Sequence, residues 1–132
     1  MTERPTMVWR RAKAEEARRI AAGELRPDWA RNTASFPEEF LVATDAAMAA
    51  FEASTAGLAG AADQAIFTVV KRFVLSLNEI NDEYGAFEET IEREMLSEYA
   101  DHVLTQAGID TSAFAERHGI GRYEIGDEWR QW

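Results

Sequence analysis

The hydrophobic positions of the chain recur every three or four residues over most of its length, which is the period of an amphipathic α-helix. The longest such pattern predicts a helix over 63–84, with Asp63 as its N-cap and Gly85 as its terminator. The apolar stripe holds its spacing over the whole segment, so we expect this helix at the centre of the fold. The stripe consists of Ile66, Val69, Val70, Phe73, Leu77, Ile80 and Tyr84.

The N-terminal part of the chain predicts one helix followed by a loop. Residues 6–22 are rich in Ala, Glu and Arg, carry a thin apolar stripe and stop at Gly23. The segment 24–34 contains a proline and no helical period, so it is predicted as a loop with Trp29 as its anchor.

Capping signals mark the starts of two further helices. Ser35 and Glu38 have the spacing of a capping box, which opens a helix over 35–54. Asp110 is predicted to cap a short helix that runs to His118.

A fifth pattern predicts a helix over 88–107 that ends at Gly108. The side chains expected to point inward from this helix are Ile91, Met95, Leu96, Tyr99, Val103 and Leu104.

These elements predict an all-α, single-domain bundle of four to five helices with an extended C-terminal tail. The basic N-terminal helix and loop occupy 1–31, the helical core 35–118, and the tail 119–132. Trp129 and Trp132 lie on one side of a final helical turn. We expect them to pin the tail onto the core; a structural role in dimerisation is the alternative.

Composition narrows the class of protein. The 132 residues suffice for a core without metal or disulfide staples, and the absence of cysteine excludes disulfides and thiolate chemistry. No apolar run approaches the length of a membrane span, and the charged N-terminus does not look like a signal peptide. We expect a cytoplasmic protein that needs no cofactor and does not bind membranes.

The net charge of −10 is unevenly distributed. Residues 1–31 hold eight basic and five acidic side chains, a balance of +3, and the remainder holds six basic and nineteen acidic ones, a balance of −13. An acidic body repels phosphates, so nucleic acid is not the expected partner. The basic segment is expected to dock on the protein's own acidic surface, and a nucleic-acid arm is the alternative.

The acidic residues concentrate in 78–101, around the predicted turn between the two longest C-terminal helices. Glutamates spaced four residues apart line each helix, and Tyr84, Phe87, Glu88 and Glu89 lie at or near the turn. Carboxylates that flank aromatic side chains suit a basic protein surface, because charges steer the encounter and aromatics anchor it. The predicted partner-binding residues are Glu79, Glu83, Tyr84, Phe87, Glu94, Glu98 and Asp101.

The acidic segment does not match two common metal-binding motifs. An EF-hand loop with Gly85 at its sixth position would begin at Ile80, which has no side-chain oxygen. A di-iron box needs Glu-x-x-His, whereas His102 follows Glu98 by four residues, so His102 is read as bordering the apolar stripe.

A magnesium site is the enzymatic alternative. Glu79-Ile80-Asn81-Asp82 and Glu98-Tyr99-Ala100-Asp101 on consecutive helices resemble the paired acidic motifs of MazG-like all-α nucleotide pyrophosphohydrolases. The resemblance implies Mg²⁺ ligation by Glu79, Asp82, Glu98 and Asp101. Helical geometry argues against this magnesium site, because Glu79 and Asp82 lie on the side of the helix opposite the apolar stripe. They could share one metal ion with the other two only if a second chain covered that side.

The segment VVKRFVLSLNEINDEYGAFEETIEREMLSEYADHVLTQAGID, together with the DEWRQW ending, resembles small acidic all-α bacterial proteins of the toxin-immunity type. The likeness covers 70–111 and 127–132. It implies tight binding of a basic toxin domain, with the acidic hairpin as the first place to look for the partner face. The favoured hypothesis is therefore a non-catalytic inhibitor that binds a basic protein. The hydrolase and a homodimeric structural protein stay open as alternatives.

Overall fold

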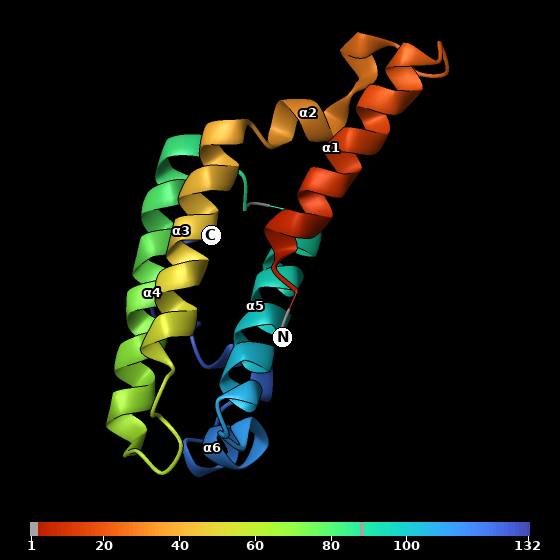
Figure 1. Cartoon of the computed structure of the whole chain (residues 1–132). Helices are drawn as coiled ribbons and strands as arrows, with labels where there is room; N and C mark the ends of the chain where they lie inside the picture. Colours follow the sequence, from red (N-terminus) through yellow and green to blue (C-terminus); the bar gives the residue numbers. More distant parts are fainter. Residues whose placement is uncertain (1–2, 88) are drawn as a thin grey trace.

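Helices α3 and α4 form an antiparallel hairpin around which the rest of the chain is arranged (Figure 1). The computed structural model describes residues 3–87 and 89–132, and within them the protein is all-α. In chain order the elements are α1 (Pro5–Ala21), the 3-10 helix η1 (Pro27–Trp29), α2 (Arg31–Ser35), α3 (Glu38–Ser54), α4 (Asp63–Tyr84), α5 (Thr90–Gln106), α6 (Thr111–Arg117) and the 3-10 helix η2 (Arg122–Glu124).

The predicted stripe of α4 forms the centre of the core. Its side chains from Ile66 to Ile80 are buried, and the ring of Phe73 stacks on Phe51 of α3 with a centroid distance of 4.4 Å. Gly85 ends α4 with φ of 63°, a left-handed conformation that a residue without Cβ adopts at little cost. The central helix and its terminator were therefore predicted correctly.

The C-terminal tail crosses the gap between α4 and α5 and packs into the bundle. Ile125 is buried, and Asn78 of α4 binds the tail backbone twice: its Nδ2 donates to the carbonyl of Trp129 and its Oδ1 accepts from the amide of Gln131. Trp132 packs on Phe87 with a centroid distance of 5.4 Å. The tail is thus pinned to the core as expected, although turns and η2 replace the extended path that the sequence analysis predicted.

The first half of α1 docks on the acidic surface of the protein itself. The guanidinium of Arg4 holds Glu52 of α3 with two hydrogen bonds of 2.9 and 3.0 Å, and Arg10 binds Asp45 at 2.9 Å. The Arg4 hydrogen bond lowers the pKa of Glu52 against the opposing effect of burial, and a 2.6 Å hydrogen bond from Tyr99 of α5 lowers it further. For this half of the basic segment, docking on the protein's own body is confirmed.

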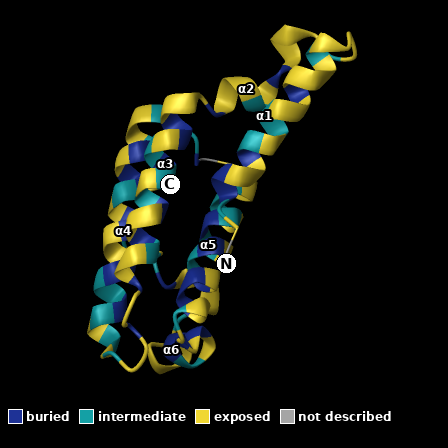
Figure 2. Cartoon of the chain, in the orientation of Figure 1, coloured by how far each residue is buried: buried dark blue, intermediate teal, exposed yellow. Residues whose placement is uncertain are grey.

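The second half of α1 and the segment through α2 project beyond the end of the bundle (Figures 1 and 2). Glu16 joins the two helices, because its carboxylate accepts hydrogen bonds from the amides of Asn32 and Thr33 and from both of their side chains. Trp29 is 62% exposed, so the prediction that it anchors this segment was wrong. Its ring packs instead under the Arg26 guanidinium.

Two predicted caps differ in the structure. Ser35 is the last residue of α2 rather than the start of α3, whose N-cap is Pro37 without a side-chain hydrogen bond. Asp63 is the first residue of α4, and its carboxylate binds Arg117 and His118 at the end of α6 instead of capping its own helix. The cap predicted for α6 is confirmed, since Asp110 accepts a hydrogen bond from the amide of Ala113.

None of the helices in the described ranges combines the length and the apolar content that crossing a membrane requires.

Candidate protein-binding face

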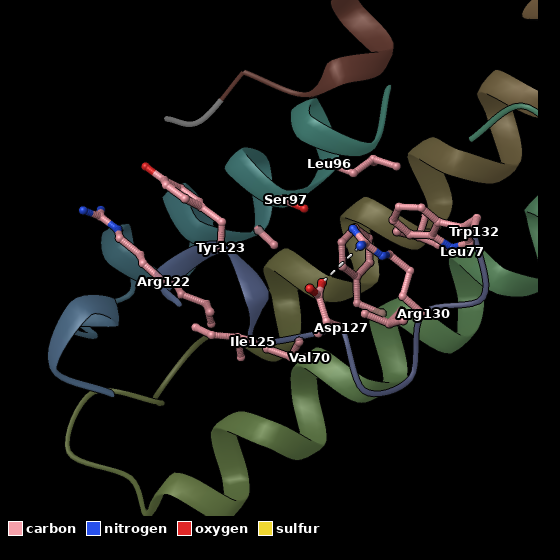
Figure 3. Close-up of a pocket in the computed structure, with 15 residues that line it drawn as sticks. Val70, Leu77, Leu96, Ser97, Arg122, Tyr123, Ile125, Asp127, Arg130 and Trp132 are labelled. Atoms are coloured by element: carbon pink, nitrogen blue, oxygen red, sulfur yellow. Dashed lines mark ion pairs between the residues drawn. The ribbon is translucent and has the colours of Figure 1, made fainter. Parts of the chain in front are cut away.

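The acidic residues of α4 and α5 lie on opposite outer sides of the bundle. Leu77 of α4 and Leu96 of α5 line the same small pocket between the helices (Figure 3). A helix turns by about 100° per residue, so Glu79 and Glu98, each two residues further on, point about 200° away from that shared interior. Both side chains are exposed. The single acidic hairpin face predicted from the sequence is therefore split into two.

The same geometry separates the carboxylates of the magnesium alternative within a single chain. Its four carboxylates, on Glu79, Asp82, Glu98 and Asp101, belong to the described residues, and no group of three or more potential ligands converges anywhere within them. The oxygens of Asp101 are both engaged by Arg122 of η2. His102 is exposed rather than set against the apolar stripe.

Asp101 is not a surface residue, although it was predicted to bind a partner together with Glu94 and Glu98. Its side chain is 1% exposed, and Arg122 donates from Nε and Nη2 to its two oxygens at 2.8 Å each. The hydrogen bond to Asp101, together with its negative charge, raises the pKa of Arg122. The C-terminal tail covers this side of α5, so Asp101 holds the tail and cannot meet a partner.

The two aromatic anchors predicted at the turn are also occupied inside the protein. Phe87 is fully buried among Phe40, Trp9 and Trp132, and its amide donates to Asn81. Tyr84 is half-buried against the edge of Phe40. Of the acidic residues predicted at this turn, Glu89 is exposed and Glu88 lies outside the described residues. The prediction that Phe87 anchors a partner was therefore wrong.

The outer side of α5 carries exposed carboxylates beside exposed apolar side chains. Glu94 and Glu98 line a shallow depression of about 690 Å³ with Tyr123 and Arg130 from the tail. Tyr123 is 50% exposed, and the Arg122 guanidinium lies 5.6 Å from the centroid of its ring. Because Arg122 is itself held by Asp101, the buried ion pair also positions this tyrosine.

A second depression adjoins the first across Glu98. It holds about 210 Å³ between the start of α1 and α5, and Val8, Met95 and Glu98 are among its lining residues. Ile91 lies one helical turn before Met95 and is 67% exposed. Ile91 was predicted to point inward from the helical pattern, and its exposure contradicts that prediction. We call the outer surface formed by Ile91, Glu94, Glu98 and Tyr123 the α5 face.

The pocket beneath the tail is too small to be a substrate site. It offers about 40 Å³, lined mainly by apolar side chains of α4, α5 and the tail (Figure 3). Ligand pockets usually span about 300–1,000 Å³. Asp127 and Arg130 line this pocket and form an ion pair with each other at 3.5 Å. Their charges are therefore matched within the tail.

No protein family matches the chain, and no significant match was found among curated proteins or solved structures.

Proposed function

We propose that this protein acts by binding rather than by chemistry, and that its α5 face covers a basic surface of a partner protein. The most specific form of the proposal is an immunity-type inhibitor of a basic bacterial toxin. The observation that supports it is the position of Glu98, which lies between two adjoining depressions and within the same outer surface as Ile91 and Tyr123.

This combination of side chains suits a protein partner. Ile91 and Tyr123 expose apolar surface, and burying that surface against a partner is favourable. Tyrosine is also enriched among the interface residues that contribute most of the binding energy. Glu94 and Glu98 supply two negative charges at the same place. Carboxylates at the edge of apolar contacts raise the association rate with a positive surface and disfavour acidic competitors.

The charges of α4 have a different expected role. Glu79 and Glu83 are exposed on the opposite side of the bundle, so they cannot touch a partner that sits on the α5 face. They still contribute to the net charge of −10, which attracts a basic partner over a distance of about one Debye length, ~8 Å at physiological salt.

Two charge-reversal variants of equal size test this proposal. Glu94→Lys/Glu98→Lys changes the α5 face, and Glu79→Lys/Glu83→Lys makes the same charge change on the far side. The partner for the assay is a basic toxin-domain protein, sought among the products of the neighbouring genes, and association and dissociation rates are measured at low and high salt. We expect the α5 pair to slow association about tenfold and to accelerate dissociation, and the α4 pair to slow association less and leave dissociation unchanged.

Two further variants separate anchoring from steering. Ile91→Ala and Tyr123→Ala should raise the dissociation rate about tenfold or more with little change in the salt dependence of association, because neither changes the charge. Equal effects of the α4 and α5 charge reversals would refute the α5 face. Binding that is indifferent to all four changes would refute the proposed mode of recognition altogether.

A further inference from the structure

The outer sides of α3 and α4 form a second apolar surface that the rest of the described chain leaves uncovered (Figure 2). Leu75 of α4 is 43% exposed, and Ala50 and Ser54 of α3 are exposed on the same side. A groove of about 390 Å³ runs between the two helices, with Ala47, Ala50 and Leu75 among its lining residues. We call this surface the α3/α4 face. It lies on different helices from the α5 face.

The charges on α4 are arranged so that two copies of the helix complement each other. Arg72 and Glu79 are both exposed, lie two turns apart on one side of α4, and form no ion pair with another described residue. The midpoint between them falls between Leu75 and Ser76. If a second α4 lies antiparallel across this midpoint, each Arg72 meets Glu79 of the other copy.

Small residues on α3 are also spaced symmetrically about one point of the helix. On its groove side, Ala43, Ala47, Ala50 and Ser54 repeat at spacings of four, three and four, and the pattern is symmetric about the point between Met48 and Ala49. An antiparallel second α3 then places Ala43 over Ser54 and Ala47 over Ala50. Alanine at the contact allows two helix axes to approach closely.

The two midpoints lie at the same height along the hairpin. Phe51 of α3 stacks on Phe73 of α4, and α3 and α4 run antiparallel, so the level of Met48 on α3 corresponds to that of Ser76 on α4. One two-fold axis, in the plane of the interface and perpendicular to both helices, therefore satisfies the charge pattern of α4 and the packing pattern of α3 together. It brings no like charges opposite each other, because Glu83 faces Thr68.

We propose that the α3/α4 face binds a second copy of this chain in an antiparallel two-fold dimer. Such an interface is self-complementary, as a two-fold axis requires. The face is as long as the 17 residues of α3 and two helices wide, which gives about 500 Å² per copy and about 1,000 Å² in total. That area is at the lower limit of specific interfaces, so we expect dissociation in the micromolar range.

Cysteine cross-linking tests the position of the axis. The chain contains no cysteine, so a single introduced thiol forms a disulfide only between copies. Leu75→Cys lies next to the axis and should be cross-linked in most molecules under mild oxidation at 100 µM protein, a concentration chosen for a micromolar dimer. Glu94→Cys on α5 is the matched exposed control and should stay monomeric. Equal cross-linking of both variants would overturn the proposed axis.

Charge reversal tests the pairing itself by sedimentation of the full chain. Arg72→Glu or Glu79→Arg alone converts two attractive contacts into repulsive ones and should raise the dissociation constant about tenfold or more. The double swap in one chain, and an equimolar mixture of the two single variants, both restore opposite charges and should recover dimerisation. A wild-type chain that sediments as a monomer at 500 µM, or single variants that dimerise as well as wild type, would overturn the proposal.

Discussion

Arg122 donates two hydrogen bonds of 2.8 Å to the carboxylate of Asp101, and it is the tail that brings the two residues together. The carboxylate is buried in a protein of net charge −10, where a negative group without a partner would be strongly unfavourable. The pair thus links two functions of the tail. It closes the bundle over α5, and it sets Tyr123 at the edge of the α5 face.

Removal of Arg122 should destabilise the protein far more than removal of an exposed arginine. Arg122→Ala leaves the Asp101 carboxylate buried without its cation, whereas Arg26→Ala removes a partner of Asp28, and both members of that pair are more than half exposed. Urea denaturation should show a clearly lower midpoint for Arg122→Ala and a midpoint close to wild type for Arg26→Ala. Arg122→Ala/Asp101→Asn should recover part of the loss, because no buried charge remains. Similar midpoints for both single variants would contradict this role.

The sequence predicted Phe87 as a partner anchor and Ile91 as a core residue, and mutations should show the reverse. Phe87→Ala opens a cavity in the fully buried aromatic cluster and should cost about 3–5 kcal/mol of unfolding free energy. Ile91→Ala removes a largely exposed side chain and should change stability by less than about 0.5 kcal/mol, while it weakens partner binding. Chemical denaturation measures both. A stable Phe87→Ala variant with impaired binding would restore the turn as the partner face.

Acid should release the connection between α1 and α2 before it unfolds the core. Burial opposes the charge of Glu16, but hydrogen bonds from Asn32 and Thr33 outweigh it and hold the pKa of Glu16 below its ordinary value of 4.5. Between the lowered pKa and the ordinary pKa, the unfolded segment binds more protons than the folded one. The stability of the folded segment therefore rises with pH in this range. The contribution is complete above about pH 4.5 and is lost as the pH falls through the folded pKa.

Hydrogen exchange of the Asn32 and Thr33 amides measures this release. After correction for intrinsic rates, their protection should fall between pH 5 and pH 3, while that of Phe73 in α4 stays high. Glu16→Gln keeps one acceptor without the charge and should lower protection at pH 5 and abolish the pH dependence. Unchanged protection in that variant would remove Glu16 as the clamp.

The helical period was sufficient to predict the main elements, because each long helix buries one continuous stripe. The central position of α4, its end at Gly85 and the cap of Asp110 are all local properties of the sequence. Asp63 failed as a cap because Arg117 and His118, distant in sequence, compete for its carboxylate. The short α2 was missed because its amides are capped by Glu16 from another helix.

The candidate surface was harder to predict, since it depends on what the tail and α1 cover. The wheel placed Glu94, Glu98 and Asp101 on one side of α5, yet only the tertiary fold shows that Arg122 buries the third. Ile91 was available to sequence reasoning, because it lies about 140° around the helix from Leu96. Tyr123 carried no such signal, since its exposure follows from the path of the tail.

The ring of Phe87 packs against Trp9 and Trp132, which lie 123 residues apart in the sequence. During synthesis α3 and α4 can pair early, because they are neighbours in the chain and loop closure between them costs little. The aromatic cluster cannot be completed until residue 132 has left the ribosome. A nascent chain therefore keeps part of the Phe87 ring exposed until the segment that carries Trp132 has been made and has docked.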